Sequence, residues 1–417
     1  MQILHQVLEE CLRNLPEQVV GEIVASKLRD QGFELSPKEQ KDMLKQIVSG
    51  KSEIRFCRSQ RENRVLSIEL NDDDFQQAEE ATSKVLAAIH GVIEGVAESL
   101  TTPILETLRK RWRNEWRQQR RMQSGFQQRL YARWKTPLDL FRMLLTIARE
   151  LGGSANEDAQ ESVSSSSPHL VYVLTRLHAR ACQVTEEILT LLTAGFADGA
   201  MARWRTLHEI AVVASFISTH GEELAERYVQ HQHIESRRAL QKYIECQDRL
   251  GYEPLTGADT ADNERECDAA IARFGSPFRH AYGWAGAQLG IENPNFAQIE
   301  KAVGVEHLRA HYQLASHNVH ANPKGAFFRL GLLRENAVLL AGPSNAGLAD
   351  PGDSAAISLV LASTTLMVIN PTLDNLVGLR IMLKLQGEIA ATFADAHQQL
   401  VKDEFGSERG SPEEKHS

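Results

Sequence analysis

The chain has 417 residues, of which 42% are hydrophobic and 24% are charged, and its formal net charge is −9 at pH 7. This composition is ordinary for a soluble globular protein, and the negative balance argues against a chain that binds nucleic acid over its whole surface. The most apolar run, residues 355–369, contains several Ser and Thr and is shorter than the about 20 apolar residues that cross a membrane, so no membrane span is expected.

The cysteine pattern indicates a reducing compartment. The five cysteines are odd in number and widely spaced, and none belongs to a C-x-x-C pair. This pattern is typical of a reduced cytosolic protein rather than of a disulfide framework or a cysteine zinc site. No apolar segment follows basic residues at the N-terminus, so no secretory signal is visible and a cytoplasmic protein is expected.

The first part of the chain is expected to be mainly helical. Residues 1–50 are typical of three short helices, the third of which begins with a capping box at Ser36 and a proline at its first position. Residues 54–70 alternate weakly between apolar and polar side chains, which predicts a small β-hairpin. Asn71 and the three aspartates after it would then cap a long helix that runs to about Leu100.

The charge balance reverses locally in residues 109–135. Ten basic residues stand there against one acidic residue, and five aromatic residues lie among them. Arginines can hold phosphates while aromatic rings stack on bases, so this segment predicts a nucleic-acid-binding surface. The arginines expected to carry it are Arg113, Arg117, Arg120 and Arg121. The alternative is a solvated helix face whose tryptophans pack inward and whose arginines pair with acids elsewhere in the chain.

A linker is expected in the middle of the chain, at residues 152–167. This stretch consists largely of Gly, Ser and acidic residues and holds almost no large apolar side chain. It would separate an N-terminal helical region, residues 1–151, from a helical bundle, residues 168–405, which is followed by a disordered tail at 406–417. The expected fold class is therefore all-α, a multi-helix bundle in two parts.

The bundle begins with two helices that are expected to pack antiparallel. Residues 169–193 carry an amphipathic stripe, and a second helix follows a short turn that contains Gly195 and Gly199. Residues 278–295 contain three glycines and are expected to be irregular and to lie over a site formed by the helices. Further helices are predicted at 222–250, 264–274, 305–321, 354–370 and 372–402.

Two of these helices carry polar residues on otherwise apolar faces. Arg205 and Glu209 stand four residues apart, so they share one face of the earlier helix. Tyr312, Ser316 and His320 also step by four and form a stripe of phenol, hydroxyl and imidazole on the later helix. Because buried polar groups must find partners, we expect these five side chains to converge.

The same residues carry a resemblance to a known family. The pattern Gly-x4-Ala-x-x-Arg-x-Arg-Thr-Leu-x-Glu, followed later by Tyr-x3-Ser-x-x-Val-His, resembles a bacterial all-helical family of unknown function. His208 departs from the pattern, since that position is usually apolar in such sequences. The resemblance covers about residues 168–400 and implies a helical fold without a settled activity. The matching residues are Arg205, Thr206, Leu207, Glu209, Tyr312, Ser316 and His320.

The residues leave the chemistry of this site open. Ser316 and His320 suggest a nucleophile and its base, but two residues four apart on one helix seldom reach the geometry of a catalytic triad. His307 and His311 have a metal-ligand spacing, yet His317 and His320 fall on other faces of the same helix, so no metal is predicted. The glycine-rich loops of nucleotide sites are absent, and no cofactor is predicted.

Two functions remain open. In the first, the protein is an enzyme acting on a phosphate-containing substrate such as RNA, with His320 as acid/base and Arg205 stabilising negative charge. This chemistry would be similar to that of helical nucleases among bacterial toxins and defence proteins. In the second, the protein is a non-catalytic helical interaction or ligand-binding protein, and the polar residues form a network that fixes helix register. A homo-oligomer is compatible with either function.

Overall fold

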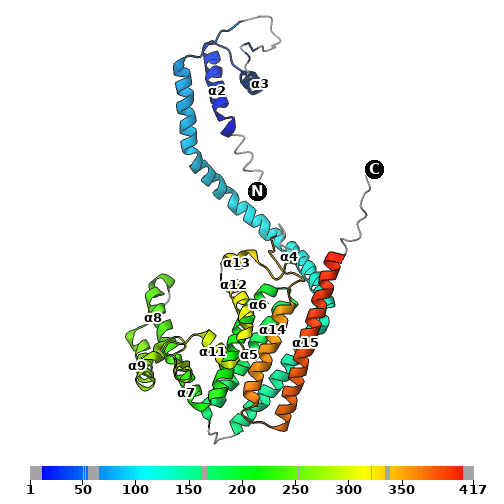
Figure 1. Ribbon diagram of the computed structural model, residues 1–417. Coiled ribbons are helices and arrows are strands. Elements are labelled where there is room, and N and C mark those ends of the chain that lie inside the picture. The colour runs from blue at the N-terminus through cyan, green and yellow to red at the C-terminus, as the bar shows by residue number, and fades with distance from the viewer. Residues whose placement is uncertain are drawn as a thin grey trace. The chain divides into compact units, whose positions relative to one another are not determined.

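The fold is all-α throughout the described part of the chain, as the sequence predicts (Figure 1). The computed structural model describes residues 12–49, 51, 53–54, 65–161, 167–251, 253–320, 322–333 and 339–406. The chain divides into two compact units, Met1–Gln119 and Arg120–Ser417. A single long helix, α4 (Asp72–Glu161), contains the boundary between them. None of the described helices is long and apolar enough to cross a membrane.

The first unit is built around two short helices, α2 (Leu15–Asp30) and α3 (Pro37–Val48). The predicted capping box is present: the Ser36 hydroxyl accepts a hydrogen bond from the Glu39 backbone nitrogen, and the Glu39 carboxylate accepts one from the Ser36 backbone nitrogen at 2.8 Å. α2 and α3 approach closely at Gly21, which lies against the Leu44 side chain. The small core that they share consists of Val24, Ala25, Leu28 and Met43.

The start of α4 is fixed by reciprocal capping. The Asn71 side chain accepts a hydrogen bond from the Asp74 backbone nitrogen at 3.0 Å, and the Asp74 carboxylate accepts one from the Asn71 backbone nitrogen at 2.8 Å. Lys27 of α2 forms an ion pair with Asp74, which ties the two helices together. The hairpin predicted just before this point is not seen, because the described residues of that stretch, 54 and 65–70, form no strand. Its remaining residues, 55–64, lie outside the described residues.

Helix α4 is much longer than the sequence predicts, and it includes most of the expected linker. It passes Leu100 without ending and continues through residues 152–161, while 162–166 lie outside the described residues. Gly152 lies so near the His178 imidazole that a Cβ atom at position 152 would sit 2.5 Å from that ring. The Leu151 side chain lies equally close to Gly378, where a Cβ atom would sit 2.8 Å from a Leu151 methyl group. The small residues at the end of α4 therefore permit close helix packing, which composition alone does not distinguish from flexibility.

The core of the second unit consists of four long helices and the adjoining part of α4. The four are α5 (Pro168–Thr193), α6 (Ala197–His220), α14 (Ala349–Met367) and α15 (Leu373–Gly406), which lie side by side in Figure 1. The α5–α6 turn uses Gly195, whose φ of 83° favours glycine. The fully buried Trp204 of α6 donates a hydrogen bond to the Ser354 carbonyl of α14 at 2.8 Å, which joins these two helices in the interior.

Shorter helices fill the interval between α6 and α14. They are α7 (Glu222–Gln230), α8 (Gln232–Leu250), α9 (Gly257–Phe274), η1 (Ser276–Arg279), η2 (Gly283–Ala285), α10 (Gly286–Leu289), α11 (Phe296–Val303), η3 (Glu306–Leu308), α12 (Arg309–Val319) and α13 (Pro323–Phe327). The helix predicted at 222–250 is divided at His231, and α9 begins at Gly257, before the start of the helix predicted at 264–274. The glycine-rich stretch 278–295 forms only short turns of helix, in line with its predicted irregularity.

Candidate functional site: a polar cluster between α6, α11 and α12

Helix α6 contributes an ion pair to the site. Arg205 Nε donates a hydrogen bond to Glu209 Oε1 at 3.1 Å, across one helical turn. The Arg205 side chain is 26% exposed and the Glu209 side chain is 35% exposed. The pair is therefore half-buried, so it is expected to contribute more to stability than a fully solvated surface pair.

Helix α12 joins this pair through Tyr312. The Tyr312 hydroxyl donates a hydrogen bond to Glu209 Oε1 at 2.5 Å, and the Arg205 guanidinium lies over the Tyr312 ring, 4.8 Å from its centroid. Burial, followed by the bond to Glu209, raises the pKa of Tyr312 to about 12. The phenol therefore stays protonated near neutral pH and acts as a hydrogen-bond donor between two helices that lie 103 residues apart in the chain.

A second carboxylate, on α11, organises the other side of the cluster. Glu300 is fully buried, and its Oε1 atom lies 2.8 Å from His208 Nε2, while Arg309 Nη1 donates to its Oε2 atom at 3.1 Å. The Arg309 guanidinium also lies over the Tyr312 ring, 4.9 Å from the centroid. Tyr312 is therefore contacted by two guanidinium groups from different helices, and each guanidinium is held by its own carboxylate.

The His208 imidazole is kept neutral by its surroundings. Burial lowers the pKa of His208, and this effect outweighs the opposing influence of Glu300. Because Nε2 lies 2.8 Å from a Glu300 carboxylate oxygen, Nε2 carries the N–H and donates a hydrogen bond to that oxygen. His208 Nδ1 has no hydrogen-bond partner among the described residues. The histidine that departs from the family pattern is thus a buried structural donor.

Tyr282, from the stretch between η1 and η2, lies within electrostatic reach of the cluster. Burial raises the pKa of Tyr282; the charge of Glu209 adds to this increase, and the charges of Arg205 and Arg309 oppose it. Its ring is 6.4 Å from that of Phe296 on α11. The irregular stretch that contains Tyr282 therefore contributes an aromatic side chain close to the charged groups.

The structure brings together some of the residues predicted from the sequence and leaves others apart. Arg205, Glu209 and Tyr312 meet through the contacts described above. The Ser316 hydroxyl donates to the Tyr312 carbonyl at 2.8 Å, a bond within α12. His320 caps the C-terminus of α12 and is exposed, about 12 Å along the helix axis from Tyr312 by helical rise. The imidazole of His320 is therefore not part of the cluster.

Sequence reasoning missed Glu300 and gave Arg309 no role in the cluster. A signal for Glu300 was present, because Phe296, Ile299 and Val303 place residue 300 inside the apolar stripe of α11. A carboxylate on such a stripe needs a buried cationic or hydrogen-bonding partner. That partner could not be identified from the pattern, since His208 lies 92 residues away in the chain.

Each carboxylate of the cluster accepts hydrogen bonds from two donors. Glu209 receives Arg205 and Tyr312, and Glu300 receives His208 and Arg309. The lone pairs of such carboxylates are already engaged by these donors, which leaves them less available to take a proton from a substrate. Each guanidinium has five N–H donors, and only one nitrogen of each bonds to its carboxylate. The arrangement is therefore better suited to holding arginines for an anion than to transferring protons.

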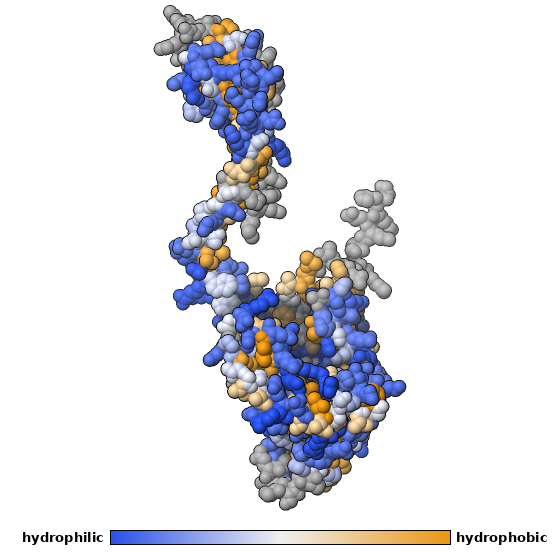
Figure 2. All heavy atoms as spheres, turned by 90° about the vertical axis from the view of Figure 1, so that its left-hand side faces the viewer, coloured by the Kyte–Doolittle hydropathy of each residue, from blue (hydrophilic) through white to orange (hydrophobic). Residues whose placement is uncertain are grey.

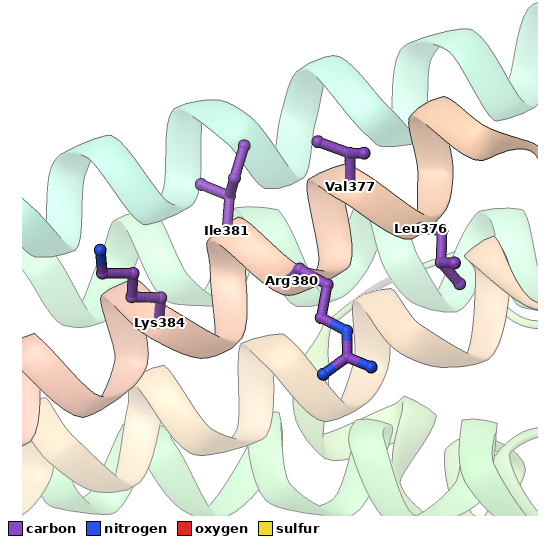
Figure 3. A pocket seen from close by; sticks show the side chains of 5 residues that line it. All are labelled: Leu376, Val377, Arg380, Ile381 and Lys384. Atoms are coloured by element: carbon purple, nitrogen blue, oxygen red, sulfur yellow. The ribbon is translucent and has the colours of Figure 1, made fainter.

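Two hollows on the second unit lie away from this cluster. One, of about 300 Å³, is on α15 and is lined by Leu376, Val377, Arg380, Ile381 and Lys384 (Figure 3). The other, of about 800 Å³, lies between the end of α4 and α5, above the His178 side chain. Neither contains a residue of the cluster.

The four arginines expected to bind nucleic acid are all exposed on α4. Arg113 and Arg117 belong to the first unit, and Arg120 and Arg121 to the second. The neighbouring Trp112 and Trp116 side chains are 56% and 47% exposed and stack with their ring centroids 6.2 Å apart. These two tryptophans do not pack inward. Trp134 of the same segment is fully buried and Arg133 pairs with Asp403, as the alternative interpretation expects, so nucleic-acid binding by this segment stays a prediction.

Comparison with known proteins finds a family model that matches the part of the chain containing the cluster. Residues 171–337 match the model of a family of unknown function, DUF5677. No curated protein and no solved structure matches the chain. The matched residues run from α5 past α13 and include Arg205, Glu209, Glu300, Arg309 and Tyr312. This segment of the chain is therefore similar to the family of unknown function DUF5677.

Proposed function

We propose that the protein is a non-catalytic ligand-binding protein and that Arg205, Tyr312 and Arg309 bind a phosphate-bearing ligand. The observation that carries the proposal is the placement of two partly exposed guanidinium groups over one tyrosine ring, at 4.8 Å and 4.9 Å. Guanidinium groups match the geometry of phosphate oxygens and can donate two hydrogen bonds at once. Glu209 and Glu300 hold the two arginines in place, which lowers the entropy lost on binding.

The cluster also fixes the register of α6, α11 and α12. The Tyr312–Glu209 and His208–Glu300 contacts each join helices that are distant in sequence. Removing one partner would leave a buried polar group without a hydrogen bond, at a cost of about 1–3 kcal/mol. The same residues therefore serve both stability and binding, and a test of binding needs variants that change the arginines alone.

The competing hypothesis is an enzyme that acts on RNA or another phosphodiester. That mechanism requires an acid/base group next to the arginines, and His320 was the expected candidate. The exposed position of His320 beyond α12 gives it no contact with Arg205, and the neutral, buried His208 already donates to Glu300. We therefore favour binding over turnover.

Isothermal titration calorimetry with inorganic pyrophosphate tests the proposal. We expect the wild-type chain to bind pyrophosphate, and Arg205→Gln and Arg309→Gln each to weaken binding at least tenfold, since each removes one guanidinium. Arg203→Gln is the matched control, because Arg203 lies on the same helix but pairs with Glu187. That variant should bind like the wild type, and thermal unfolding should show that all three variants fold.

Two results would contradict the proposal. One is equal pyrophosphate affinity in the wild type and in both cluster variants. The other is cleavage of a short RNA oligonucleotide that is lost in His320→Ala, since this would establish the enzyme hypothesis instead.

A further inference from the structure

Helix α4 carries an apolar stripe that the first unit leaves uncovered. Within α4, apolar residues follow one another at steps of three or four, so they form one continuous row, which the repeated steps of four after Val96 turn gradually around the helix. They are Leu86, Ile89, Ile93, Val96, Leu100, Ile104, Leu108, Trp112 and Trp116. Except for Ile89 and Leu100, which are half-buried, all are exposed; Leu108 retains 59% of its exposure and Trp112 56%. Figure 2 shows the apolar atoms, in orange, interrupting the blue hydrophilic surface along α4.

An uncovered stripe of this length indicates a protein-binding face. Isolated exposed apolar residues are normal, but a contiguous row of large ones is typical of an interaction surface. The stripe spans about 45 Å by helical rise, the length of a coiled-coil segment of roughly four heptads. Nucleic acid would account for exposed arginines and tryptophans but not for the leucine, isoleucine and valine residues that precede them.

The charges along the same helix select the partner. Residues 72–106 hold eight acidic residues and one lysine, whereas residues 109–117 hold five basic residues and one glutamate. The basic residues of the second stretch are exposed, and none forms an ion pair within the described part of the chain. One helix therefore has an acidic half and a basic half, divided near the middle of its apolar stripe.

We propose that this face of α4 binds the same face of a second copy of the chain, in antiparallel orientation. An antiparallel pair places the acidic half of each copy against the basic half of the other and buries both apolar stripes. A parallel pair would oppose like charges along the whole interface. Flanking charges commonly set the orientation of paired helices, and a twofold axis makes one surface complementary to itself.

Charge reversal in the full-length chain tests the proposal by light scattering coupled to size-exclusion chromatography. We expect the wild type to be dimeric at low salt and to dissociate as salt rises, because screening weakens the pairing of opposite charges. Glu94→Lys with Glu98→Lys, and separately Arg109→Glu with Arg111→Glu, should each yield monomers. An equimolar mixture of the two variants should recover a heterodimer, because each reversed half again meets the opposite charge.

The control variant Arg380→Glu with Lys384→Glu replaces two basic residues by glutamate, as the Arg109 and Arg111 variant does, but on α15 and outside the stripe. This control should remain dimeric. A monomeric wild type overturns the proposal, and so does a dimer that neither α4 variant disturbs. A monomeric chain that binds single-stranded RNA through Arg109 and Arg111 would identify the face as a nucleic-acid surface instead. The pyrophosphate titration has a separate readout and does not depend on this result.

Discussion

At the scale of single residues, burial decides which polar groups are charged. His178 of α5 is 3% exposed and lies 3.1 Å from the Ser363 hydroxyl of α14 through Nε2. Burial lowers the pKa of His178 to about 4. An amphipathic stripe predicted α5 from sequence, but it could not show that this histidine faces inward, because Cys182 and Ser363 complete its surroundings only in the folded chain.

The depressed pKa of His178 predicts a loss of stability in mild acid. The unfolded chain protonates this histidine near pH 6.5, whereas the folded chain resists protonation down to about pH 4. Between these values the unfolded state binds more protons, so the free energy of unfolding falls as pH falls, by up to about 3 kcal/mol from this group. Urea denaturation at several pH values should show a smaller fall for His178→Gln. Parallel curves for the two proteins would contradict the assignment.

At the scale of elements, the lengths and contacts of helices were harder to predict than their presence. The stripe of 169–193 predicted α5 closely, and that of 354–370 predicted the presence of α14 but not its start at Ala349, because buried apolar faces repeat with the helical period but do not mark where a helix begins. The sequence did not predict that α4 continues through residues 152–161, because this part has no repeating apolar face. A helix with glycines and few large side chains resembles a linker in composition. Its helical form depends on packing against His178 and Gly378, which the local sequence does not reveal.

Two adjacent glycines near the end of α4 provide a matched test of that packing. Gly152→Ala should lower the free energy of unfolding by about 1–3 kcal/mol, because the new methyl group would overlap the His178 ring. Gly153→Ala meets open space and should raise stability by up to about 1 kcal/mol, through the better helix propensity of alanine. Thermal or urea unfolding measures both. Equal effects would argue that 152–161 is not a packed helix.

At the scale of the whole molecule, composition and periodicity predicted the all-α class, but they did not predict where the chain divides into two compact units. The sequence placed the boundary at the glycine- and serine-rich stretch 152–167, whereas the compact units separate between Gln119 and Arg120, inside α4. A boundary within a continuous helix carries no glycine or proline signal. In the site, Arg205, Glu209 and Tyr312 were predicted from their stripes, while Glu300 required knowledge of which helices pack together.

A crystal soaked with tungstate tests most directly whether Arg205 and Arg309 jointly hold an anion over Tyr312. Tungstate mimics phosphate, and its metal gives an anomalous signal. We expect an anomalous peak with tungstate oxygens within hydrogen-bonding distance of both guanidinium groups, and no such peak in crystals of Arg205→Gln. Tungstate bound at other arginines, with no density next to Tyr312, would show that these two arginines do not form an anion site.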